Sequence, residues 1–108
     1  PVMHYDGCTD GEICTAILRA NGIPDAVIGA RIEETFHHLA KSFESALGRY
    51  ELTVLPGVRE LLNKLAADSV PCGVATGNIA AIARMKLHKA GLEHLLPVGG
   101  FADDGHRR

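Results

Sequence analysis

The sequence predicts an α/β fold that is predominantly helical, with a helical segment over residues 1–52 and part of a parallel α/β core over residues 53–108. Two observations predict it. Apolar residues recur every three or four positions along residues 25–47, which is the period of an amphipathic helix. A short apolar run at residues 70–75 then lies between two further helical patterns, and this alternation is typical of a parallel sheet.

The first segment is expected to be a pair of antiparallel helices. Residues 9–22 begin with Thr9 and Glu12, the Thr-x-x-Glu pattern of a capping box, and Gly22 is placed to end the helix in a left-handed conformation. A longer helix is predicted over residues 25–47. Its apolar face consists of Ile28, Ile32, Phe36, Leu39, Phe43 and Leu47. Together the two helices would form half of a small bundle.

The second segment alternates between helix and strand. A helix is predicted from Val58, and a strand over residues 70–75 is expected to be buried on both faces. A further helix is predicted over residues 79–90, followed by a second strand near residues 95–98. In an open parallel sheet, ligands bind beyond the carboxyl ends of the strands.

The loop after the first predicted strand has the composition of an anion site. Thr76 offers a hydroxyl donor, Gly77 and Asn78 offer backbone N–H groups, and the following helix adds the positive end of its dipole. Gly77 has no side chain, so an anion could approach the backbone closely. Phosphate is the expected guest. A purely structural interpretation stays open, in which Asn78 is simply the N-cap of the next helix.

Composition argues against two classes of partner. The net charge of −2 and the 5% of aromatic residues are atypical of nucleic-acid binding, and the only cationic cluster lies at residues 106–108. The apolar runs are short and interrupted, so we expect no membrane span. Three cysteines without disulfide spacing predict free thiols and a cytoplasmic protein.

The cysteines and histidines admit a second interpretation. Cys8, Cys14, His37 and His38 are ligand types that zinc accepts. Without a Cys-x-x-Cys pair, we expect buried thiols and surface imidazoles rather than a metal site.

Five segments carry a resemblance to a known family. They are residues 7–10 (Gly-Cys-Thr-Asp), 55–62 (Leu-Pro-Gly-Val-Arg-Glu-Leu-Leu), 73–78 (Gly-Val-Ala-Thr-Gly-Asn), 86–87 (Lys-Leu) and 90–92 (Ala-Gly-Leu). In this order they resemble the haloacid dehalogenase-like hydrolase superfamily, and most closely its phosphoglycolate-phosphatase-like branch. The resemblance implies a partial helical cap domain over residues 1–52 and part of a Rossmann-like core over residues 53–108.

The resemblance implies a phosphatase of small phosphate monoesters, which transfers the phosphoryl group to an aspartate and hydrolyses it with magnesium. By position, Thr76 matches the residue that holds the phosphoryl oxygens, and Gly77 would add its N–H. Lys86 matches the cation that neutralises charge at the site, because its side chain slants back toward the helix N-terminus; Arg84 is the alternative.

Gly7, Thr9 and Asp10 match the cap loop that faces the substrate in related enzymes. The capping box accounts for Thr9 without any ligand, so both interpretations of this loop stay open.

Two motifs of the family are missing. No Asp-x-Asp-x-Thr follows an apolar strand, so the nucleophile is absent, and Asp6 and Asp10 do not replace it. Asp103 and Asp104 follow Gly-Gly-Phe-Ala and are expected in a solvated loop rather than at magnesium. We therefore expect no metal ligands in this chain and no activity of the chain alone. A sequence that starts at Pro1 also leads us to expect part of a longer protein.

Other functions remain compatible with the sequence. A non-catalytic interaction or regulatory module could have kept this part of the fold, and a mutase or dehalogenase could use the same scaffold. The missing first strand leaves open strand edges, which favours homodimerisation.

Overall fold

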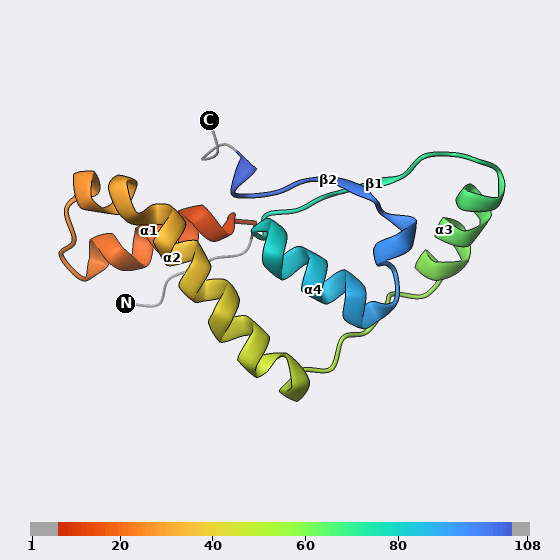
Figure 1. Ribbon diagram of the computed structural model, residues 1–108, viewed down its shortest axis with the longest axis horizontal. Coiled ribbons are helices and arrows are strands. Elements are labelled where there is room, and N and C mark those ends of the chain that lie inside the picture. The colour runs from red at the N-terminus through yellow and green to blue at the C-terminus, as the bar shows by residue number, and fades with distance from the viewer. Residues whose placement is uncertain (1–6, 105–108) are drawn as a thin grey trace.

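The structure is a computed structural model that describes residues 7–104. Asp6 and the cationic residues 106–108 lie outside the described residues. The chain forms α1 (Asp10–Ala20), α2 (Asp25–Ala46), a 3-10 turn (Leu47–Arg49), α3 (Val58–Ala67), β1 (Gly73–Ala75), α4 (Ala80–Ala90), a second 3-10 turn (Glu93–Leu95) and β2 (Val98–Gly100). Figure 1 shows α1 and α2 at one end of the molecule, α3 at the other, and α4 between them.

The helical pair α1–α2 forms as predicted. The Thr9 hydroxyl accepts from the backbone N–H of Glu12 at 3.1 Å, and the Glu12 carboxylate accepts from the Thr9 N–H, so the capping box is confirmed. Gly22 has φ +80°, which is the left-handed conformation expected there. The helix predicted over residues 25–47 forms as α2, with a kink at Arg31 (φ −120°, ψ 15°).

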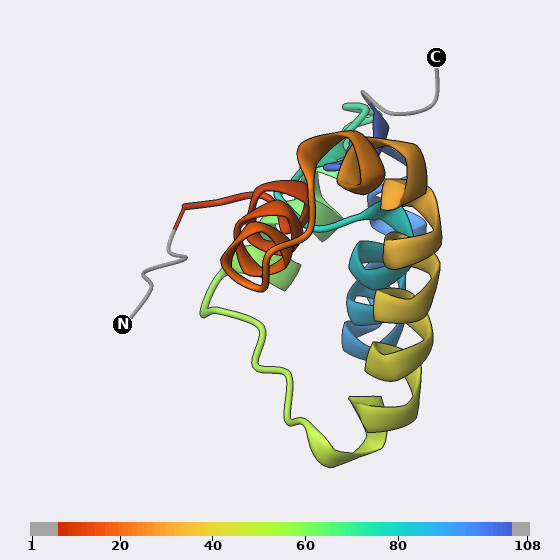
Figure 2. The same cartoon turned by 90° about the vertical axis from the view of Figure 1, so that its left-hand side faces the viewer.

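The hydrophobic core lies between α2 and α4. Ile28, Ile32 and Phe36 of α2 are buried against Ile79 and Ile82, and Ile79 is only 2% exposed. Figures 1 and 2 show α4 running beside α2. This core therefore joins the two sequence segments that were expected to be a cap and a core.

Two cationic side chains link the C-terminal end of α4 to α3 and to the segment after α2. Arg59 of α3 donates to the carbonyl oxygen of Ala90 at 2.5 Å, and Lys89 donates to the carbonyls of Leu47, at 2.6 Å, and Tyr50. Cations next to the carbonyls that end a helix are favourable, since the helix dipole is negative there. Gly91 closes α4 with φ +72°.

The parallel sheet is smaller and more exposed than predicted. β1 and β2 pair in parallel, with Gly73 opposite Val98 and Ala75 opposite Gly100. β1 covers only three residues, and β2 begins at Val98 rather than near residue 95, because residues 93–95 form a 3-10 turn. The expected burial of β1 on both faces is wrong. Gly73 and Ala75 are exposed, since no further strand in residues 7–104 flanks the pair.

The chain is more open than a compact domain of its length. Its radius of gyration is 16.0 Å, against about 13 Å expected for a domain of this size. Its accessible surface is 7483 Å², against about 5,800 Å² expected for its mass. Leu55, just before α3, Leu61 on α3 and Val98 on β2 are 57–70% exposed. Within the part of the chain that the structure describes, no helix is both long and apolar enough to cross a bilayer.

Candidate functional site at the start of α4

The candidate site lies where both strands end. The backbone N–H of Thr76 donates to the carbonyl of Gly100 at 3.1 Å, and the N–H of Ala102 donates to the carbonyl of Asn78 at 2.9 Å. These bonds hold the segments after β1 and β2 side by side at the N-terminus of α4. The predicted loop thus occupies the carboxyl edge of the parallel sheet, where α/β proteins bind ligands.

Gly77 lies against the backbone that leads into α1. A Cβ atom at this position would come within 3.1 Å of the Cys8 carbonyl oxygen and 3.3 Å of the Thr9 Cα. The N–H of Asp10 also donates to the Gly77 carbonyl at 2.7 Å. A side chain here would press on the backbone of residues 8–10, so glycine favours their close approach, a reason that sequence reasoning did not anticipate.

Asn78 connects the two parts of the chain instead of capping α4. The N-cap of α4 is Ile79, so the structural interpretation of Asn78 as N-cap is wrong. The Asn78 side-chain amide donates to both carboxylate oxygens of Asp10 at 3.3 Å, and its carbonyl accepts from Lys86 Nζ at 2.9 Å. Its own backbone N–H donates to the Thr76 hydroxyl oxygen at 3.1 Å.

Two carboxylates accept hydrogen bonds from the backbone N–H groups at the start of α4, which have no partner within the helix. Asp10 Oδ2 accepts from the N–H of Ile79 at 2.7 Å, and Asp103 Oδ1 accepts from the N–H of Ala80 at 2.9 Å. Negative charge is favourable at this end of a helix. Asp103 is only 8% exposed, so its expected place in a solvated loop is wrong. Asp104 is exposed and accepts from the N–H of Phe101 at 2.7 Å.

A sequence signal for these carboxylates did exist. The first turn of α4 contains no acidic residue, and Ile79 has no side chain that can cap it. Free N–H groups at a helix start bind side chains, water or ligands, so the sequence indicated that partners outside α4 were needed but not which ones.

Lys86 and Arg84 point to different partners. The Lys86 side chain runs back along α4 to Asn78, as its position on the helix predicted, and Nζ lies 5.6 Å from the centre of the Phe43 ring. The Arg84 guanidinium carbon lies 5.2 Å from the centre of the Phe101 ring. Of these two cations, Lys86 is therefore the one that the structure brings to the loop after β1.

The three residues predicted for the cap loop, Gly7, Thr9 and Asp10, differ from one another in their contacts. Gly7 is exposed, and the Thr9 side chain is bonded to Glu12 within the capping box. Only Asp10 has a side chain bonded to the loop and the start of α4.

Burial raises the pKa of the nearby Cys14 thiol, and the negative charge of Asp10 raises it further.

Several donors at the site keep capacity for a ligand. The Thr76 hydroxyl oxygen accepts a hydrogen bond, which leaves its proton able to donate. Within residues 7–104 the N–H of Gly77 donates to no other group. An ammonium has three protons, and Lys86 uses one of them on Asn78. These three groups belong to the loop after β1 and to α4, and they could receive an anion.

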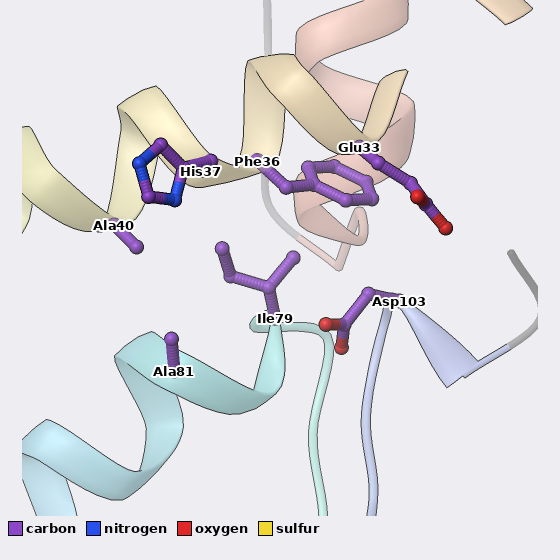
Figure 3. Close-up of a pocket in the computed structure, with 7 residues that line it drawn as sticks. All are labelled: Glu33, Phe36, His37, Ala40, Ile79, Ala81 and Asp103. Carbon is purple, nitrogen blue, oxygen red and sulfur yellow. The ribbon is translucent and has the colours of Figure 1, made fainter. Parts of the chain in front are cut away.

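A neighbouring pocket is lined by acidic side chains instead of anion-binding donors. It has a volume of about 320 Å³ and lies between α2 and the start of α4. In Figure 3, Phe36 and Ile79 point toward one another inside it, and Glu33 and Asp103 place their carboxylates at one end. His37 of α2 also lines it. Among the described residues that line this pocket, none is Lys or Arg, so the donors that suit an anion lie in the loop after β1 rather than here.

The described residues do not fit a metal site. Within residues 7–104, no three His, Cys, Asp or Glu side chains gather closely enough to hold an ion. His37 and His38 are exposed, as expected, whereas Cys8 and Cys14 are half-buried.

Comparison with known proteins places the chain in a family. No curated protein and no solved structure gives a match. The sequence profile described as haloacid dehalogenase-like hydrolase matches residues 14–107, nearly the whole chain. The mostly helical structure with a small parallel sheet is consistent with part of that α/β fold. The chain belongs to the haloacid dehalogenase-like hydrolase family.

Proposed function

We propose that this chain is the cap and part of the core of a phosphatase that acts on small phosphate monoesters, similar to the phosphoglycolate-phosphatase-like branch. One observation carries the proposal. Thr76 and Asn78 follow a parallel strand, and Lys86 reaches back along α4 to Asn78 at 2.9 Å. A hydroxyl, a backbone N–H that is unpaired among residues 7–104, and an ammonium beside one helix N-terminus suit a phosphoryl group.

Each residue has a separate task in this proposal. The Thr76 hydroxyl and the Gly77 N–H donate to phosphoryl oxygens and orient the ester. Lys86 offsets the negative charge of the phosphoryl group and of the nucleophile, and Asn78 holds its ammonium in place. Such fixed donors lower the barrier because they need no reorganisation during the reaction.

The nucleophile has to come from outside this sequence. Phosphoryl transfer to an aspartate needs an Asp-x-Asp-x-Thr strand, which the sequence lacks. Because the described residues also provide no magnesium site, the chain alone is expected to be inactive. We assign residues 1–52 to the cap and residues 53–108 to the core of a cytoplasmic enzyme.

The decisive variants act on Thr76 in the intact enzyme. A hydrogen bond to a charged group contributes about 1.5–3 kcal/mol, so Thr76→Val should lower kcat/KM for phosphate esters by about 10- to 150-fold. Thr76→Ser keeps the hydroxyl and should retain most of the activity. Urea unfolding of each variant controls for stability. Full turnover in a folded Thr76→Val enzyme removes Thr76 from the site.

A second candidate function is a non-catalytic regulatory module of the same fold. It is favoured by the Asp10 carboxylate, which already holds the N–H of Ile79 at the start of α4. The flanking DNA distinguishes the two functions. An upstream Asp-x-Asp-x-Thr strand and later acidic residues support the enzyme, whereas a start codon before Pro1 and a stop codon after Arg108 support the module.

Product analysis of the intact enzyme separates the related chemistries. A phosphatase releases inorganic phosphate, a mutase returns an isomeric ester, and a dehalogenase releases halide.

A further inference from the structure

We propose that Asp10 is a built-in competitor of phosphate, which keeps the anion site closed until its carboxylate turns away. We call its side-chain hydrogen bonds to Asn78 and Ile79 the Asp10 clasp. The inference rests on the proposed function, since it assigns a regulation to the same phosphate site.

The clasp puts a negative charge where a phosphoryl group is expected. Asp10 Oδ2 lies 2.7 Å from the Ile79 nitrogen at the start of α4, and both oxygens lie 3.3 Å from the Asn78 amide nitrogen. A phosphate at the neighbouring Thr76 hydroxyl and Gly77 N–H would lie beside this carboxylate at the same helix N-terminus, and two anions sharing one site repel each other. The carboxylate and the phosphate therefore exclude one another.

The clasp also affects the cation of the site. Asn78 is bonded on one side to Asp10 and on the other to Lys86 Nζ at 2.9 Å. When Asp10 leaves, the side-chain amide of Asn78 becomes a donor for a phosphoryl oxygen, while its carbonyl still holds Lys86. Opening the clasp thus adds a donor to the site and removes a competing charge.

Opening requires only a local change. The capping box between Thr9 and Glu12 lies within α1 and does not depend on the Asp10 side chain. The bond from the Asp10 N–H to the Gly77 carbonyl is made by the backbone and can persist. The packing of Ile79 against α2 is likewise independent of the carboxylate. The Asp10 side chain can therefore rotate away while both helices stay in place.

The test is titration of the 108-residue chain with inorganic phosphate, followed by the amide NMR signals of Gly77 and Ile79. Asp10→Asn removes the charge but keeps an oxygen that accepts from Ile79. Its phosphate Kd should fall about tenfold, within the 5- to 150-fold range typical of coupled binding events. Asp68→Asn, at the exposed end of α3, is the matched control because it changes the net charge equally, and its Kd should stay at the parent value.

The outcomes separate this inference from the proposed function. Equal Kd values for the parent and Asp10→Asn overturn the clasp but leave the phosphate site intact. Weaker binding by Asp10→Asn also overturns it, since Asp10 would then be part of the site. If no variant binds phosphate, the clasp and the phosphate site both fall.

A second readout covers the case in which Asp10→Asn does not fold. In the parent chain, the carboxyl ¹³C signal of Asp10 should shift with phosphate along the same binding curve as the Gly77 amide. A carboxyl signal that stays fixed while Gly77 titrates overturns the clasp without any substitution.

Discussion

Truncation of Ile79 tests whether the two halves of the chain share one core. Ile79 is 2% exposed and packs with Ile28, Ile32 and Phe36 of α2. Ile79→Ala removes roughly three methylene equivalents, or about 2.4 kcal/mol at about 0.8 kcal/mol each. A residual cavity raises the loss further, so we expect a decrease of about 3–4 kcal/mol in the free energy of unfolding.

Urea unfolding followed by circular dichroism at 222 nm measures this loss. With a slope of about 1–3 kcal/mol per molar urea, the midpoint should fall by roughly 1–4 M. Ile79→Val gives a graded second value, a loss of about 0.5–1.5 kcal/mol, if the alanine variant is unfolded in water. Leu61→Ala is the control, because Leu61 is 57% exposed and surface changes stay within about 0.5 kcal/mol.

Two results would refute this reasoning. One is an Ile79→Ala midpoint no lower than that of Leu61→Ala, which would mean that Ile79 is not buried. The other is a pair of separate transitions in the parent chain, which would mean that α2 and α4 unfold independently. A single transition that moves with Ile79 supports one shared core.

Three further predictions concern individual contacts. Thr9→Ala should destabilise the chain by about 0.5–2 kcal/mol in urea through loss of the capping box, whereas Thr53→Ala in the exposed linker should change nothing. Because the pKa of Cys14 is raised, the rate of its reaction with iodoacetamide should increase at higher pH than the rate of an unburied thiol. Asp10→Asn should shift this pH–rate profile only partly back to lower pH, since burial is the larger cause of the raised pKa. A profile that does not shift contradicts the contribution of Asp10. If the open strand edges drive homodimerisation, light scattering should show a concentration-dependent dimer that Val98→Lys weakens; a strict monomer at all concentrations contradicts that expectation.

Much of the fold could be predicted because its helices are encoded locally. The capping box at Thr9, the left-handed Gly22 and the helices α1 to α4 all appear where the residue pattern placed them. Capping and periodicity depend on residues within a few positions of each other. The strands were predicted less well, since burial of a strand depends on neighbours that the pattern of one strand does not contain.

The candidate site was predicted in its parts but not in its arrangement. The sequence indicated Thr76, Gly77, Asn78 and Lys86, and the structure brings Asn78 and Lys86 into contact. Their role in phosphate binding stays a prediction. The position predicted for Asp103, in a solvated loop, was wrong. Its carboxylate bonds to the N–H of Ala80, which is 23 residues away, and no pattern of neighbouring residues indicates such a contact.

The amino-acid sequence alone was enough to predict the helices, to reveal the family resemblance and to show that the nucleophile motif is absent. That Asp10 reaches the start of α4, 69 residues further along the chain, is visible only in the folded structure. The same holds for Gly77, where a Cβ atom would come within 3.1 Å of the Cys8 carbonyl oxygen. Helix caps and periodicity depend on residues that are close in the sequence. A hydrogen bond between a carboxylate and a distant N–H depends instead on the packing of the hydrophobic core, which holds α2 against α4.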